Sequence, residues 1–176
     1  MIHDNDQQQE ITADESSTRA NLRLGALGWN HANWQDSFYP DDLPADWQLG
    51  FYANEFNSVL VPEAEWRANL HELEGWAEEV PENFRFYLQM VQRDEAEVAH
   101  LSGLLGQSLG AVISYDASDF LQPPFALLNY SSRSLREWRE WLDVHGDSLQ
   151  AIFLADATLS VQQLSDFKSL IEMLGL

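Results

Sequence analysis

Short apolar runs alternate along the chain with longer stretches in which apolar residues recur every three or four positions. The apolar runs are only a few residues long and predict buried strands over 22–27, 58–61, 84–91, 111–115, 125–128 and 151–154. The periodic stretches predict helices over 44–56, 70–77, 98–105, 134–144 and 160–174. Strands that alternate with helices in this way are typical of an α/β fold, in which helices cover a parallel sheet.

The pattern does not distinguish an open doubly wound sheet from a β/α barrel. Complete eight-stranded barrels usually need about 200 to 250 residues, whereas this chain has 176. Gly25 and Gly28 lack the spacing of a phosphate-binding loop. We therefore expect one domain over residues 21–176, with about six strand–helix units.

Residues 1–20 are polar and acidic, and they predict a disordered acidic tail before that domain. They contain neither the basic start nor the apolar stretch of a signal peptide. No apolar run in the chain approaches the roughly 18 residues that span a bilayer. We therefore expect a cytoplasmic protein.

Acidic residues outnumber basic ones by 29 to 9, which gives a formal net charge of −20. No Lys or Arg occurs between Arg23 and Arg67. Nucleic acids and anionic membrane surfaces are bound through Lys and Arg, so the charge argues against both as partners. The main interpretation is a solvated acidic surface. A docking face for a basic protein partner is the alternative.

The sequence predicts neither a metal nor a cofactor. It contains no cysteine, which excludes disulfides, thiolate nucleophiles and thiolate metal sites. The five histidines are scattered, with none paired four residues apart. His31, Glu63, Asp116 and Asp156 offer nitrogen and oxygen ligands of the kind that divalent ions use, but their spacing does not single out a metal site.

Several rare residues in the first half of the chain keep a recognisable spacing. The run Leu24-Gly25-Ala26-Leu27-Gly28-Trp29 is followed by Trp34 and by Phe38-Tyr39-Pro40-Asp41-Asp42-Leu43-Pro44. These segments resemble the opening of the YecE-like family, also called domain of unknown function 72. Its members typically begin with Ile-Gly-Thr-Ser-Gly-Trp and continue to Phe-Tyr-Pro-x-x-Leu-Pro. The resemblance extends through Trp76-Ala77 and Pro81-Glu82-Asn83-Phe84-Arg85-Phe86 to about Met90.

The family is similar to β/α barrels of eight strands, and beyond Met90 this chain matches it more weakly. Residues 109–113 resemble its fourth strand, and 125–128 and 151–174 resemble its last two units. The resemblance therefore implies a TIM-barrel-like fold that keeps the first four and the last two units, with two middle units absent.

The chain departs from the family at polar positions near the strand ends. Leu60 and Pro62 stand where the family usually has Glu and Asn, and Gln89 stands where it usually has Lys. Residues 115–118 and 129–131 replace its Gln-Leu-Pro-Pro and His-Gly-Arg runs. Leu and Gln cannot act as general acids or bases. The resemblance thus implies a degenerate site.

Function in parallel β/α folds lies at the carboxyl ends of the strands. The candidate ligand-binding residues at those positions are Trp29, Asn30, His31, Glu63, Gln92, Arg93, Asp116, Asn129, Arg133 and Asp156. Together they could hold a small polar ligand, with Trp29 as a stacking surface and an arginine for an anion. The tryptophans at helical spacing are predicted core residues, namely Trp47, Trp76, Trp138 and Trp141.

Two functional hypotheses follow. The first is a non-catalytic binding or interaction module; because six strands would leave an unpaired sheet edge, it predicts a homodimer or cover by a loop or the tail. The second is an enzyme that acts on a small polar substrate, either sugar-like or phosphorylated. That enzyme would need His31, Glu63, Asp116 and Asp156 within hydrogen-bonding reach of one another.

Overall fold

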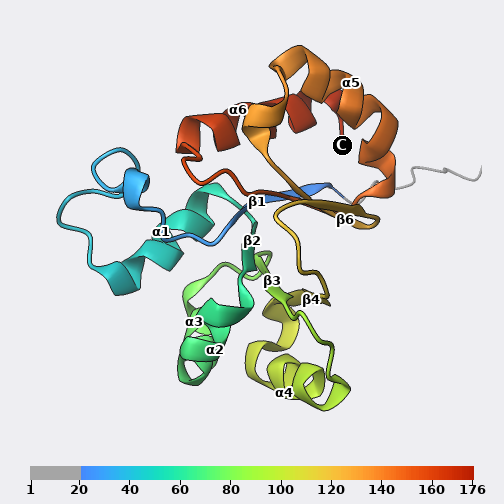
Figure 1. The fold of residues 1–176 in the computed structure, drawn as a ribbon. Helices are drawn as coiled ribbons and strands as arrows, with labels where there is room; N and C mark the ends of the chain where they lie inside the picture. Colours follow the sequence, from blue (N-terminus) through green and yellow to red (C-terminus); the bar gives the residue numbers. More distant parts are fainter. Residues whose placement is uncertain (1–20) are drawn as a thin grey trace, which may run out of the picture.

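The structure is a computed structural model that describes residues 21–176, and the predicted tail over 1–20 lies outside the described residues. One sheet of seven strands runs through the molecule, with helices packed against its outer face (Figure 1). The strands follow the order β4-β3-β2-β1-β7-β6-β5. All neighbouring strands are parallel except β5 and β6, which are antiparallel.

Six strands coincide with the apolar runs that the sequence predicts, and one is additional. The strands are β1 Arg23–Leu27, β2 Ser58–Val61, β3 Arg85–Gln89, β4 Leu109–Ile113, β5 Phe120–Gln122, β6 Phe125–Leu128 and β7 Ala151–Leu154. The additional strand, β5, lies between the predicted strands over 111–115 and 125–128. The described residues therefore contain seven strands, six of them parallel.

The helices follow the predicted stretches closely, except near residue 63. They are α1 Gln48–Glu55, α2 Glu63–Ala68, α3 Leu73–Glu79, α4 Glu95–Leu105, α5 Leu135–His145 and α6 Val161–Leu174. The short α2 was not predicted. Ser134 and Ser160 begin α5 and α6 with capping boxes, in which the serine hydroxyl and a side chain three residues later satisfy backbone N–H groups reciprocally.

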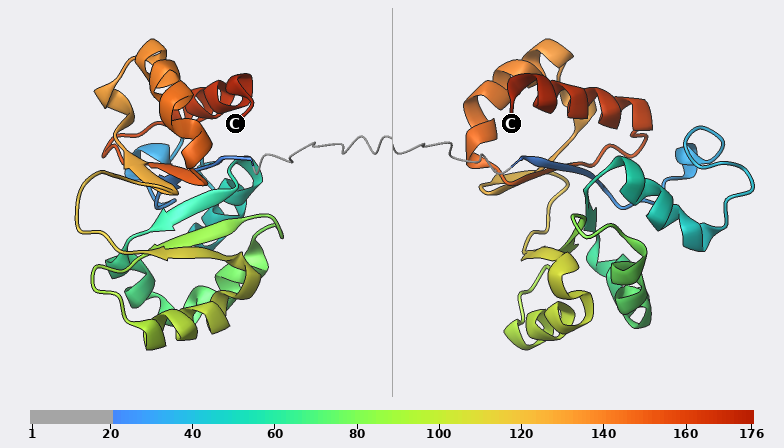
Figure 2. Two further views of the ribbon diagram at one scale, coloured as in Figure 1. Left: turned by 90° about the vertical axis from the view of Figure 1, so that its right-hand side faces the viewer. Right: turned by 180° about the vertical axis from the view of Figure 1, so that it is seen from behind.

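The pairing of β1 shows which part of a barrel is present. This strand pairs on one side with β2 and on the other with β7, the last strand of the chain. Pairing of the first strand with the last is what closes a β/α barrel. The opening therefore lies between β4 and β5, where the resemblance implies two absent units. The connection between these strands runs from one half of the sheet to the other (Figures 1 and 2).

The sheet is curled rather than flat. The Tyr87 ring on β3 lies 5.0 Å from the Phe153 ring on β7 and 5.5 Å from the Phe125 ring on β6. In a flat sheet, β3 and β7 would be three strand spacings apart, about 14 Å. Contacts across the concave face thus confirm an incomplete TIM-barrel-like fold.

Side chains alternate between two cores, as the twofold period of a strand requires. One face of the sheet packs against the helices and contains the fully buried Trp34, Trp66 and Trp138. The concave face is filled by strand and loop residues, and its buried members are Leu60, Tyr87, Ile113, Tyr115, Leu127, Ala151 and Phe153. The interior of the partial barrel is therefore a packed core.

Candidate functional site

The predicted site residues all follow the carboxyl ends of parallel strands. Trp29, Asn30 and His31 come after β1, Glu63 after β2, Gln92 and Arg93 after β3, Asp116 after β4, Asn129 and Arg133 after β6, and Asp156 after β7. Because the parallel strands share one direction, these segments lie on the same rim of the curled sheet. Their contacts show what each side chain does there.

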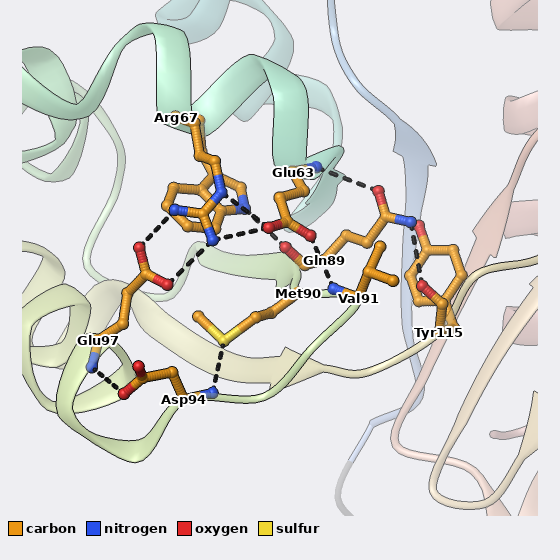
Figure 3. Close-up of polar contacts among 9 residues, drawn as sticks. Glu63, Arg67, Gln89, Met90, Val91, Asp94, Glu97 and Tyr115 are labelled. Carbon is orange, nitrogen blue, oxygen red and sulfur yellow. Dashed lines mark hydrogen bonds and ion pairs between the residues drawn. The ribbon is translucent and has the colours of Figure 1, made fainter.

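The amide of Gln89 joins three strand ends at this rim (Figure 3). Its Oε1 accepts a hydrogen bond from the backbone N–H of Glu63 at 3.1 Å, and its Nε2 donates to the Tyr115 carbonyl at 3.2 Å. The Gln89 carbonyl accepts from the Trp66 indole at 2.6 Å. At the position where the resemblance implies an ionisable lysine, this chain has a neutral amide that hydrogen-bonds to the two neighbouring strand ends.

Glu63 belongs to an ion-pair network on the outer side of the same rim (Figure 3). Its Oε2 accepts from the Val91 N–H at 2.7 Å, and Arg67 donates to its Oε1 at 2.7 Å. Arg67 also donates two bonds to Glu97, at 2.5 and 2.9 Å. The hydrogen bond from Val91 is the main cause that lowers the pKa of Glu63, followed by Arg67. Glu63 thus joins α2 to the segment after β3, and Arg67 joins α2 to α4.

Asp156 is 8% exposed and is satisfied by the turn that follows β6. It accepts from the backbone N–H groups of Tyr130 and Ser131, at 2.5 and 2.9 Å, and from the Ser131 hydroxyl. The Asn129 carbonyl in turn accepts from the Ser132 hydroxyl at 2.6 Å. These bonds fix the connection between β6 and α5.

The residues after β1 pack mainly against the protein. Trp29 is 7% exposed and meets the Trp76 ring edge-on at 4.9 Å. His31 stacks on Trp34 at 4.2 Å, and its Nε2 lies 3.2 Å from the Gly28 carbonyl. Burial lowers the pKa of His31, so its imidazole is neutral at pH 7.

Arg93 and Arg133 also have protein partners, whereas Asp116 is exposed. Arg93 donates to Glu95 at 2.5 Å and to the Val112 carbonyl at 3.1 Å. The Arg133 guanidinium lies 4.8 Å from the centre of the Trp138 ring. Within residues 21–176, no hydrogen bond joins any two of the four residues that an enzyme would need, namely His31, Glu63, Asp116 and Asp156.

Among residues 21–176, no three His, Asp or Glu side chains are grouped so that they could hold a metal ion. None of the helices described there has the length and the apolar character needed to cross a membrane.

A cavity of about 570 Å³ lies beside this rim, between the end of β1, the start of α1, and α2 and α3. Trp29 and Asn30 line it, and they are its only members among the predicted site residues. Its other walls carry Gln48 and Trp76, with four carboxylates from Asp46, Glu65, Glu72 and Glu79. The absence of Lys and Arg between Arg23 and Arg67 was the sequence signal for an acidic region here. Only the fold brings the side chains of this cavity together.

Two carboxylates of this cavity, Glu65 and Glu79, have no hydrogen-bond or ion-pair partner among the described side chains, whereas Glu72 lies 3.6 Å from His71. Burial raises the pKa of Glu65. The pKa of Glu79 is raised by burial and then by the negative charges of Asp46 and Glu72. In contrast to Glu63, neither side chain accepts a hydrogen bond from a described residue. Carboxyl groups with raised pKa values in a cleft are typical of functional sites.

Comparison with known proteins gives a match to one family over part of the chain. Residues 23–94 match the family described as Protein of unknown function DUF72. The matched segment runs from β1 to the residue before α4, and it confirms the resemblance read from the sequence over that part of the chain. Searches of curated proteins and of solved structures gave no significant match.

Proposed function

We propose that this chain, whose residues 23–94 match a family of unknown function, is a non-catalytic binding module. It keeps the curled sheet and lacks acid–base chemistry at the strand ends. The observation that carries this proposal is the Gln89 amide, which bonds to Glu63 and Tyr115 where the resemblance implies lysine. An amide neither gives nor takes protons at neutral pH.

The surroundings of Gln89 support the same function. Leu60, Tyr87, Ile113 and Phe153 fill the concave face, as side chains fill the interior of a complete barrel, so a ligand of this fold is expected at the strand-end rim. Glu63 and Asp156 are held by protein donors on several sides. Their carboxylate oxygens accept hydrogen bonds from protein groups at the rim, which is a structural role.

The charge of the chain favours a cationic ligand or partner. Twenty-nine acidic residues against nine basic ones would make two copies repel each other. Strand β4 pairs only with β3 among the described strands, so its other edge has no strand partner there. Of the two kinds of partner considered from the sequence, a basic protein therefore fits better than a second copy. Sedimentation velocity of the full chain at about 0.1 M salt should show a monomer, and a stable dimer would favour the homodimer instead.

An activity screen tests the absence of catalysis. We expect the full chain to give no turnover of chromogenic glycosides, phosphate esters or carboxylic esters above buffer. The same screen is run on Asp116→Asn, which changes an exposed side chain, and on Glu63→Gln. A rate that either variant loses, and that the exposed control Glu74→Gln keeps, would identify an enzyme and overturn the proposal.

A further inference from the structure

The cavity between β1, α1 and α2–α3 has the size of a small-molecule site. We call it the carboxylate pocket and define it by Trp29, Gln48, Glu65, Trp76 and Glu79. Its volume of about 570 Å³ falls within the range of roughly 300 to 1,000 Å³ that is usual for ligand sites. It lies beside the strand-end rim and is separate from the packed concave face.

Gln48 is an unpartnered polar side chain in the wall of this pocket. It is 6% exposed, and its amide makes no hydrogen bond with any described residue. The enclosed, unbonded side-chain atoms among residues 21–176 are Asn57 Oδ1 and Ser58 Oγ. The amide of Gln48 is not among them, so it still reaches the open space of the pocket. Buried polar groups normally have a partner, and a ligand in the pocket that Gln48 lines would supply one.

The two tryptophans of the pocket are also buried and also have a polar group without a hydrogen-bond partner among the described residues. Trp29 and Trp76 are each 7% exposed, and neither indole N–H donates a hydrogen bond within residues 21–176. By contrast, the indoles of Trp34, Trp66 and Trp138 all donate to backbone carbonyls. Aromatic walls together with unused polar groups are typical of a site for an organic ligand.

The charge of the pocket decides which ligand fits. Four carboxylates and His71 line it, with His71 Nε2 3.6 Å from Glu72, whereas no Lys or Arg does. The nearest arginine in sequence, Arg67, is occupied by Glu63 and Glu97. A cation would stabilise the charged form of Glu65, which burial disfavours. It would also reduce the repulsion that Asp46 and Glu72 exert on Glu79.

We infer that the carboxylate pocket binds a small organic cation, whose ammonium or guanidinium group pairs with Glu65 and Glu79 and whose polar part bonds to Gln48. Cationic groups are also attracted to aromatic rings such as those of Trp29 and Trp76. The inference rests on the binding function proposed above and gives it a ligand class and a place. A bare metal ion fits less well, because the side chains described here form no metal-ligand group.

Isothermal titration of the full chain with putrescine and agmatine tests this inference, with the neutral 1,4-butanediol as the control ligand. We expect both amines to bind and the diol not to bind. Glu79→Gln and Gln48→Leu should each weaken amine binding at least fivefold. Glu78→Gln removes the same charge from α3 one residue away, outside the pocket, and should leave binding unchanged.

The outcomes separate the ligand sources and the two proposals. No binding of either amine at millimolar concentration, or equal binding by Glu79→Gln and wild type, overturns the inference. Binding of a blocked arginine peptide without binding of agmatine overturns it too, and assigns the pocket to a protein partner. Loss of the inference leaves the non-catalytic assignment in place. Conversion of the bound amine, followed by NMR, would instead overturn that assignment while amine binding stands.

Discussion

At the scale of single residues, the hydroxyl of Tyr52 completes the pairing of β1 with β2. It accepts from the Ala26 N–H at 2.9 Å and donates to the Ser58 carbonyl at 2.8 Å, and the side chain is fully buried. Burial raises the pKa of Tyr52, so the phenol stays protonated. Tyr52→Phe leaves two backbone groups without their partner. We expect it to lower the free energy of unfolding by about 1–3 kcal/mol in urea denaturation.

Tyr115→Phe is the matched control for that loss. Tyr115 is 7% exposed, and its hydroxyl makes no hydrogen bond with the described residues. Its removal should therefore change the free energy of unfolding by less than about 0.5 kcal/mol. Equal losses in the two variants would contradict the bridging role of Tyr52.

Glu65 makes a prediction about pH. Burial raises the pKa of Glu65, so the folded chain holds this proton more tightly than the unfolded chain. The stability that Glu65 contributes is therefore present below the unfolded pKa of about 4.3 and is lost as the pH rises through the folded pKa. Glu65→Gln removes this dependence, so the variant should be more stable than wild type near pH 7.

Urea denaturation between pH 5 and pH 8 measures the difference. The gain of Glu65→Gln over wild type should grow with pH and then level off. Glu74→Gln, at an exposed position on α3, should show no such trend. If Glu65→Gln instead became less stable relative to wild type as the pH rises, the Glu65 carboxylate would have a compensating partner in the folded chain.

The limits of the sequence are clearest at individual side chains. The sequence places Trp47 in the core, yet it is 65% exposed. It belongs to a 3₁₀ turn before α1, where three residues per turn move its side chain off the α-helical stripe. Gln89 could be recognised as a replaced position, but its two hydrogen bonds depend on backbone groups 26 residues away on either side.

At the scale of elements, β1 and β2 approach so closely that one position must be glycine. A Cβ on Gly25 would lie 2.1 Å from the Ser58 carbonyl oxygen, a backbone atom that cannot turn away. Gly25→Ala should therefore cost more than about 3 kcal/mol or prevent folding, because it separates central strands. Circular dichroism and urea denaturation measure this change.

Gly103, inside a helix, is a position where alanine should stabilise the protein, in contrast to Gly25. It lies within α4, and a Cβ there would meet nothing within 4 Å. Gly103→Ala should raise the free energy of unfolding by about 0.5–1 kcal/mol, since alanine loses less backbone entropy on folding. Destabilisation by Gly103→Ala, or tolerance of Gly25→Ala, would each contradict this account of the two positions.

The elements that the sequence failed to predict are the short ones. Strand β5 has three residues and is held by antiparallel pairing to β6. Helix α2 has six residues, too few for a helical period to stand out. The longer runs were predictable because burial on both faces makes a parallel strand almost wholly apolar.

At the scale of the whole molecule, the sequence predicted the arrangement of the site better than its chemistry. Strand count, length and resemblance placed the candidate residues after the correct strand ends, and the pairing of β1 with β7 puts them on one rim. The sequence could not show whether each polar group there is free. Asp156 is an example, since its three donors come from a turn 25 and 26 residues earlier.

The acidic excess is a property of the molecule as a whole and predicts how its stability responds to salt. A formal charge of −20 on 176 residues makes the folded chain repel itself. The Debye length falls from about 30 Å at 0.01 M salt to about 10 Å at 0.1 M, so sodium chloride should screen that repulsion. We expect the Tm to rise by about 2–4 °C between 0.01 and 0.2 M, which corresponds to about 1 kcal/mol. Most of the rise should occur below 0.2 M, because screening saturates there whereas salting-out continues at higher concentration. A Tm that falls with salt would mean that local attractions, such as those of Arg67 with Glu63 and Glu97, outweigh the net charge.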